Sequence, residues 1–236
     1  MTYEICAFDD RRPRRRTMRW LAVASIASFA WAAVPAAATG YNETSGDLSN
    51  LNNSPTLVTF GIGDNFITGA TGNSGTTAAT IDRDYFTFTL LPGQELTAIM
   101  VLDGTTSIAG PDPDHPKSFI GIEAGPHVTD PAAPVVGDLL GYTHYGPSLI
   151  KSDILDDIGG GAGAQGFSGP LGAGTYSVWI QEANMGRADY AFNFLVRAVP
   201  EPSSWAMMLS GFGLIGWSMR RSQKRKGPSS ARSLAM

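Results

Sequence analysis

Asp84-Tyr85-Phe86-Thr87-Phe88-Thr89-Leu90 alternates its side chains with a period of two residues. An extended chain would place Tyr85, Thr87 and Thr89 on one face and Phe86, Phe88 and Leu90 on the other. Because an α-helix repeats every 3.6 residues, this alternation predicts a β-strand with one buried face.

Similar alternation recurs along residues 39–199, between segments rich in glycine, proline and aspartate. The clearest further strands are predicted at 96–102, 175–181 and 190–196, and weaker ones at 56–60, 65–68, 118–123 and 138–143. Pro92-Gly93 is a predicted turn between the first two strands. The pattern predicts an all-β domain, an antiparallel β-sandwich or jelly roll of about eight strands.

Residues 148–158 depart from the period of two. Leu149, Ile150, Ile154, Leu155 and Ile158 have spacings that suit one face of a short amphipathic helix. We expect this helix to cover one end of the sandwich. An edge strand is an alternative with nearly equal support.

The charge of the predicted domain differs from that of the whole chain. The chain has a formal charge of −4, but residues 39–199 carry 17 acidic and 5 basic side chains and hence a charge of −12. Nucleic-acid binding requires Lys and Arg near phosphates, so the domain is not expected to bind nucleic acid. Cys6, the one cysteine, precedes the domain, which must therefore be stabilised by its core without a disulfide.

The C-terminal region combines three features in a fixed order. First comes a proline-bracketed motif with Pro200, Glu201, Pro202, Trp205 and Ala206. An apolar run at 205–219 follows, and then a basic cluster formed by Arg220, Arg221, Lys224, Arg225 and Lys226. A membrane helix needs about 20 apolar residues. The run of 15 would span only a thin bilayer or with help from flanking residues, and the basic cluster would remain on the cytoplasmic side.

This order resembles the PEP-CTERM sorting signal of Gram-negative bacteria, in the variant with Trp-Ala after the motif. The resemblance implies export, transient residence in the inner membrane and processing by an exosortase-type enzyme. Delivery to the cell surface or extracellular matrix would follow. It assigns residues 200–226 to the sorting signal, with a membrane span at 205–219, and residues 227–236 to a cytoplasmic tail. An uncleaved C-terminal anchor is the alternative.

The N-terminal region has the pattern of a secretory signal peptide. Arginines at 11, 12, 14, 15, 16 and 19 precede an apolar stretch at 20–34, and Ala36-Ala37-Ala38 offers a cleavage site. We therefore assign residues 1–38 to a signal peptide, within which Met18 could be the true start.

Two segments of the domain resemble bacterial pre-peptidase C-terminal domains, which are small β-sandwiches of secreted proteins. Asp82 to Gln94 is similar to the opening hairpin of that family, and Gly172 to Trp179 with Asp189 to Phe192 is similar to its final hairpin. The resemblance implies a sandwich attached to a secreted protein.

No sequence motif predicts catalysis. The serines lack a Gly-x-Ser-x-Gly elbow, and the three histidines, at 115, 127 and 144, are far apart in sequence. We therefore expect no enzyme activity and no cofactor. Structural calcium is a weaker expectation, for which Asp153, Asp156 and Asp157 are the candidate ligands because calcium takes oxygen ligands from carboxylates.

Three aromatic residues are candidates for glycan contact. Trp179, Tyr142 and Tyr145 lie on predicted strands or beside them and could stack on sugar rings. Burial of Trp179 in the core is the alternative that we favour, because large aromatic residues dominate core packing.

The sequence thus predicts an exported surface or exopolysaccharide-matrix protein with a structural or adhesive β-sandwich and weak glycan binding. Its expected partners are an exosortase-type enzyme, transiently the inner membrane, and exopolysaccharide. The alternative is a secreted hydrolase that acts on polysaccharide or protein.

Overall fold

The structure is a computed structural model that describes residues 39–75, 77, 80–108, 118–199 and 202–224. Its strands are β1 (Thr39–Asn42), β2 (Thr56–Leu57), β3 (Gly63–Asn73), β4 (Ile81–Leu90), β5 (Gln94–Val101), β6 (Ser118–Ala124), β7 (Leu139–His144), β8 (Gly174–Glu182) and β9 (Gly186–Ala198). The helices are η1 (Glu43–Ser45), η3 (Val136–Asp138), η4 (Pro147–Leu149), α1 (Leu155–Gly159) and α2 (Pro202–Lys224). The predicted signal peptide at 1–38 and the predicted tail at 227–236 lie outside the described residues.

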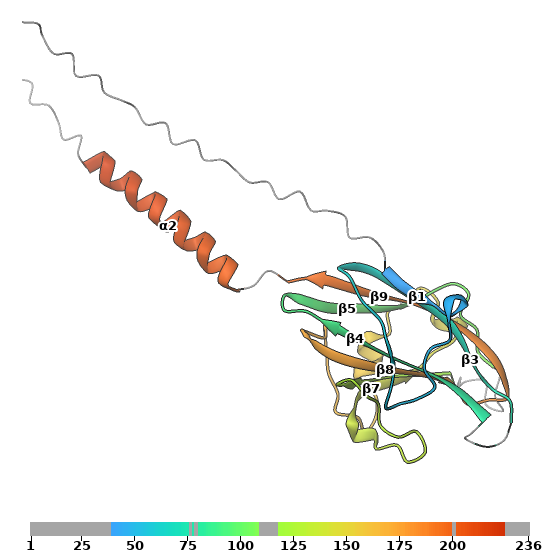
Figure 1. Cartoon of the computed structure of the whole chain (residues 1–236). Helices are drawn as coiled ribbons and strands as arrows, with labels where there is room; N and C mark the ends of the chain where they lie inside the picture. Colours follow the sequence, from blue (N-terminus) through green and yellow to red (C-terminus); the bar gives the residue numbers. More distant parts are fainter. Residues whose placement is uncertain (1–38, 76, 78–79, 109–117, 200–201, 225–236) are drawn as a thin grey trace, which may run out of the picture. The chain divides into compact units, whose positions relative to one another are not determined.

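The strands form one curled sheet in the order β5-β9-β3-β4-β8-β6-β7, with β1 beside β3 and β2 beside β4 (Figure 1). The pairs β1–β3 and β2–β4 are parallel and the remaining pairs are antiparallel. β3 and β4 share only two residue pairs, whereas β3 and β9 share eleven. The sheet folds back at this short junction. One limb of the sheet consists of β5, β9, β3 and β1, the other consists of β4, β8, β6, β7 and β2, and the two limbs face each other. The prediction of a mostly antiparallel β domain is confirmed, and the described residues form nine strands where about eight were expected.

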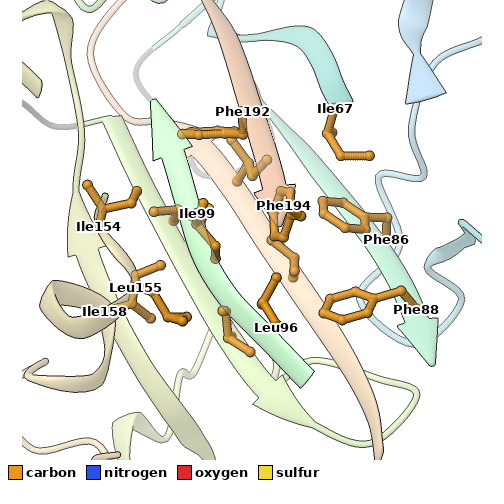
Figure 2. Close-up of a cluster of buried hydrophobic side chains, with 14 of the residues drawn as sticks. Ile67, Phe86, Phe88, Leu96, Ile99, Ile154, Leu155, Ile158, Phe192 and Phe194 are labelled. Atoms are coloured by element: carbon orange, nitrogen blue, oxygen red, sulfur yellow. The ribbon is translucent and has the colours of Figure 1, made fainter. Parts of the chain in front are cut away.

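The two limbs enclose one aromatic and aliphatic core. Figure 2 shows side chains of β4, β5 and β9 directed into a shared interior. The ring of Phe194 lies 5.6 Å from that of Phe86 and 6.1 Å from that of Phe88, centre to centre. Phe86 and Phe88 come from one limb and Phe194 from the other, so these contacts hold the limbs together. The inward positions are those predicted from the alternation along β4.

The strand partners differ from the two hairpins that the sequence resemblance implied. The predicted turn at Pro92-Gly93 is present, and Gln94 N–H donates to the Leu91 carbonyl at 2.9 Å. Yet β4 pairs with β8 and β5 pairs with β9, so the turn carries the chain from one limb to the other. β8 and β9 also lie in different limbs. The alternation of apolar and polar side chains predicts which face of a strand is buried, but it does not predict which strand lies beside it in the sheet.

Residues 148–158 contain parts of both predicted alternatives. The short helix η4 ends at Leu149, and Lys151, two residues later, has a positive φ of 70°. Residues 151–154 then follow the edge of β5, where Ile154 N–H donates to the Ile99 carbonyl at 2.9 Å. Only α1, five residues long, is α-helical, and its Leu155 and Ile158 pack into the core (Figure 2). The prediction of one short helix is confirmed by α1, but this helix does not extend over residues 148–154, because the edge of β5 offers residues 151–154 backbone partners.

We predict that Phe194→Ala lowers the free energy of unfolding by about 3–5 kcal/mol, because a buried ring leaves a cavity between the limbs. Phe194 has no exposed surface, whereas Phe66 is 38% exposed. Phe66→Ala is therefore the matched control and should cost less than about 1 kcal/mol. Urea denaturation followed by tryptophan fluorescence measures both. Equal losses in the two variants would contradict the assignment of Phe194 to the contact between the limbs.

Candidate functional site

Three carboxylates meet where β3 and β4 diverge. Glu43 of η1, Asp47 and Asp84 of β4 each offer an oxygen, and these oxygens lie within 4.8 Å of one another. Asp84 is fully buried, Glu43 is partly buried and Asp47 is exposed. We call these three residues the acidic cluster. Within the described ranges, no other group of three or more Asp, Glu, His or Cys side chains is close enough to hold a metal ion.

Glu43 is held by two hydrogen bonds. The Ala70 N–H donates to its Oε2 at 2.8 Å, and the Tyr190 hydroxyl donates to its Oε1 at 2.8 Å. Gly69 makes this approach possible, because a Cβ at that position would overlap both the Glu43 carboxylate and the Tyr190 hydroxyl. The position of Glu43 is therefore fixed by one residue of β3, Ala70, and one residue of β9, Tyr190.

Asp84 faces the protein interior. Among the residues that the structure describes, neither of its carboxylate oxygens has a hydrogen-bond partner. The single hydroxyl proton of the nearby Tyr190 is donated to Glu43. A buried carboxylate that lacks both a partner and a counter-ion is costly. Asp84 was not among the site residues predicted from the sequence. The alternation nevertheless indicates its position, because Asp84 is in phase with Phe86 and Phe88 and therefore points inward with them.

Burial and neighbouring negative charge shift the ionisation of this region. Burial, together with the charge of Glu43, raises the pKa of Asp84 to about 9. Burial and then the charge of Asp84 raise the pKa of the Tyr190 hydroxyl. Burial and then the charge of Asp47 raise the pKa of Asp82. Each of these groups therefore ionises less readily than the same side chain in water.

Two residues of the acidic cluster, Glu43 and Asp47, line a hollow of about 690 Å³ on the protein surface. Its lining includes Glu43, Asp47, Asp82 and Asp189, together with Arg187. Arg187 forms an ion pair with Asp189, in which Nη2 of Arg187 lies 3.1 Å from Oδ1 of Asp189. The hollow is thus dominated by negative charge, which suits a cation and disfavours an anionic ligand.

The structure does not bring together the calcium ligands predicted from sequence. Asp153 Oδ1 accepts hydrogen bonds from the N–H groups of Ile99 and Leu155, at 2.9 and 3.0 Å. Asp156 Oδ1 accepts one from the Gly169 N–H at 3.1 Å. Asp157 is exposed on α1. Asp153 and Asp156 thus serve as acceptors for backbone donors.

The three aromatic residues proposed for glycan contact lie in different surroundings. Tyr145 has no exposed surface and packs in the main core, where its ring is 4.9 Å from that of Phe192. Trp179 is 5% exposed and belongs to a second cluster, on the outer face of the limb that contains β8. Neither presents an open face to a sugar ring, so the favoured assignment of Trp179 to buried packing agrees with its position.

Tyr142 of β7 is the partly exposed member of the three. Its ring stacks on that of Phe119, with 5.7 Å between the ring centres, and its hydroxyl donates to the Ala162 carbonyl at 2.9 Å. His144 is exposed, and the centre of its ring lies 6.2 Å from the centre of the Phe119 ring. An aromatic surface is therefore present, but it consists of Phe119, Tyr142 and His144.

The C-terminal signal falls partly outside the described residues. Pro200, Glu201, Arg225 and Lys226 are not described. Pro202 begins helix α2, at a position that suits proline because its missing N–H needs no partner there. Trp205, Ala206 and Lys224 lie within α2. Arg220 and Arg221 are exposed, and the guanidinium of Arg221 lies 4.3 Å from the ring centre of Trp217.

Among the described residues, none of the helices is both long and apolar enough to cross a membrane. The prediction of a membrane span at 205–219 is thus not confirmed, although α2 covers these residues. The physical reason is composition, because serines and glycines at 210, 211, 213, 216 and 218 interrupt the apolar run.

Comparison with known families identifies the C-terminal signal. Residues 198–222 match the PEP-CTERM protein-sorting motif. The chain therefore carries a PEP-CTERM motif, the mark of an exported protein that is handled at the membrane and processed by an exosortase. No curated protein and no solved structure matches the chain, and the resemblance to pre-peptidase C-terminal domains is not confirmed.

We predict that the metal-free protein loses stability as the pH rises from about 4 to about 9. Because the pKa of Asp84 is about 9 in the folded state, the folded protein keeps a proton that the unfolded chain releases near pH 4. The stabilisation is complete below pH 4 and is lost as the pH passes 9. Asp84→Asn should reduce this dependence, because the amide does not titrate. Urea denaturation in EDTA at several pH values measures both proteins, and equal slopes would contradict the prediction.

Proposed function

We propose that this protein is an exosortase-sorted component of the cell surface or the exopolysaccharide matrix. Its β domain serves a structural or adhesive role and catalyses no reaction. The observation that carries this proposal is the PEP-CTERM motif at residues 198–222. The motif concerns the destination of the protein, and the proposed role of the domain follows from that destination.

The properties of the domain are compatible with an extracellular location. Its stability comes from the core between the two limbs, and it needs no disulfide. Its net charge of −12 over residues 39–199 favours solubility and disfavours nucleic acid as a partner. In the proposed pathway the N-terminal 38 residues are removed during export. The chain is then handled at the inner membrane until an exosortase cuts near the Pro-Glu-Pro motif.

We predict that replacing the motif by alanine, as Pro200→Ala/Glu201→Ala/Pro202→Ala, prevents sorting. The host should then retain the uncut chain, because two prolines and their acidic neighbour define an extended site that the processing enzyme recognises. Intact mass spectrometry of membrane, surface and matrix fractions measures the outcome. The unchanged protein should be recovered from the surface or matrix with a mass that ends near Pro200.

The matched control is Ser203→Ala/Ser204→Ala, which changes the two positions between the Pro-Glu-Pro motif and Trp205. This variant should be sorted as the unchanged protein is. Recovery of a surface or matrix protein that still contains residues 205–225 would contradict processing. Equal retention of both variants would contradict recognition of the motif.

A second element of the proposal is weak glycan contact through Phe119, Tyr142 and His144. The stacked rings of Phe119 and Tyr142 are partly exposed on β6 and β7, and β7 ends the strand order of its limb. Stacked aromatic rings with a polar edge are suited to the apolar face of a sugar. This proposal replaces Trp179 and Tyr145 with Phe119 and His144 and keeps Tyr142.

We predict that Tyr142→Ala weakens binding to exopolysaccharide of the host by about three- to tenfold, which is the range expected for one aromatic contact. Affinity gel electrophoresis with the purified polysaccharide measures this change. Phe66→Ala, which removes a partly exposed ring from β3, is the control and should leave mobility unchanged. Equal mobility of the two variants at all polysaccharide concentrations would contradict the contact.

The rival function is a secreted hydrolase that acts on polysaccharide or protein. His144 Nδ1 lies 3.3 Å from the backbone carbonyl oxygen of Ser118, and the Ser118 hydroxyl donates to Glu182 Oε2 at 2.6 Å. The Ser118 hydroxyl is thus engaged with a carboxylate, whereas a nucleophilic serine needs the histidine as its base. This arrangement favours the structural or adhesive role.

A further inference from the structure

We propose that the acidic cluster of Glu43, Asp47 and Asp84 binds a calcium ion. This site is distinct from Asp153, Asp156 and Asp157 and goes beyond the surface role proposed above. The proposal rests on the arrangement of the three carboxylates and on the absence of partners for the buried one.

The first observation is convergence. The three carboxylates come from η1, from the segment after η1 and from the middle of β4, yet their oxygens lie within 4.8 Å. When all three carboxylates are ionised, their negative charges repel one another at such distances. A divalent cation between them would turn this repulsion into attraction and would take the place of the proton that Asp84 keeps in the ion-free protein.

The second observation is the unsatisfied carboxylate of Asp84. This side chain is fully buried, and neither Oδ1 nor Oδ2 has a hydrogen-bond partner in the described part of the chain. Most buried polar side-chain atoms have at least one partner, so an exception of this kind requires an explanation. Because an oxygen of Asp84 is directed toward those of Glu43 and Asp47, a shared cation provides the missing partner.

The chemistry of the donors selects the kind of ion. All three side chains are carboxylates, and the Tyr190 hydroxyl lies beside them. Hard oxygen donors of this kind favour calcium, whereas zinc sites usually use cysteine and histidine. The surface hollow of about 690 Å³ gives an ion and its water ligands a route to the cluster.

Such an ion would fasten the start of the domain to the sheet. Glu43 and Asp47 belong to the first ten described residues, and Asp84 of β4 pairs with Ile180 of β8 near one end of that strand pair. The neighbouring segment is anchored in two further ways: Leu48 is buried, and the Tyr85 N–H donates to the Ser49 carbonyl at 2.9 Å. Extracellular calcium modules bind with dissociation constants of about 10⁻⁴–10⁻³ M. A site of that affinity would fill after export and stiffen the domain where it functions.

The test is thermal unfolding of the full chain in EDTA and in CaCl₂ or MgCl₂. At a calcium concentration about 100 times the dissociation constant, the melting temperature of the unchanged protein should rise by about 5–10 °C. Asp84→Asn keeps the shape of the side chain and removes its charge, so its melting temperature should not respond to calcium. Asp157→Asn, which removes an exposed carboxylate on α1, should respond as the unchanged protein does.

A second variant keeps the proposal testable if Asp84→Asn does not fold. Gly69→Ala removes no charge, but its methyl group would displace the Glu43 carboxylate. We expect it to weaken calcium binding at least tenfold in isothermal titration with CaCl₂, while far-UV circular dichroism remains unchanged. A melting temperature of the unchanged protein that does not respond to 10 mM CaCl₂ would overturn the proposal. So would an equal calcium response in Asp84→Asn, or a response to magnesium alone.

Discussion

The packing of Phe86 and Phe88 against Phe194 is the contact on which the rest of the domain depends. These rings come from strands that are not hydrogen-bonded to each other, so the backbone ladder alone does not bring them together. Burial of aromatic surface supplies the driving force that folds the sheet at the short β3–β4 junction. Once the limbs face each other, α1 and the neighbouring segment at 151–154 complete the core against β5.

The same fold creates the acidic cluster. The inward face of β4 continues from Phe88 and Phe86 to Asp84, and that of β9 continues from Phe194 and Phe192 to Tyr190. The apolar core therefore ends in polar groups at the place where β3 and β4 separate and η1 packs against them. A carboxylate in this position is unfavourable for stability unless it keeps a proton or gains a cation. The presence of a buried carboxylate at this position is the reason that we assign a ligand to this end of the domain.

The sorting signal depends on different physics. It consists of a proline-bracketed motif, a stretch with apolar side chains and a basic end, and each of these is a property of the local sequence. Such a signal is recognised by other proteins through its local sequence, and this recognition does not depend on the fold of the β-sheet. The family match therefore identifies the handling of the protein without identifying what its domain contacts.

The sequence by itself determined the β class, the inward residues of β4 and β9, the turn at Pro92-Gly93 and the sorting motif, because each is encoded within a few neighbouring residues. It did not determine that β4 and β5 lie in different limbs, that residues 151–154 follow a strand edge, or that Tyr145 is buried. Nor did it bring Glu43, Asp47 and Asp84 together, although Asp84 stood in phase with the core. Only the tertiary structure decided these points, since they depend on which strands become neighbours. That choice is made by burial summed over residues far apart in the chain.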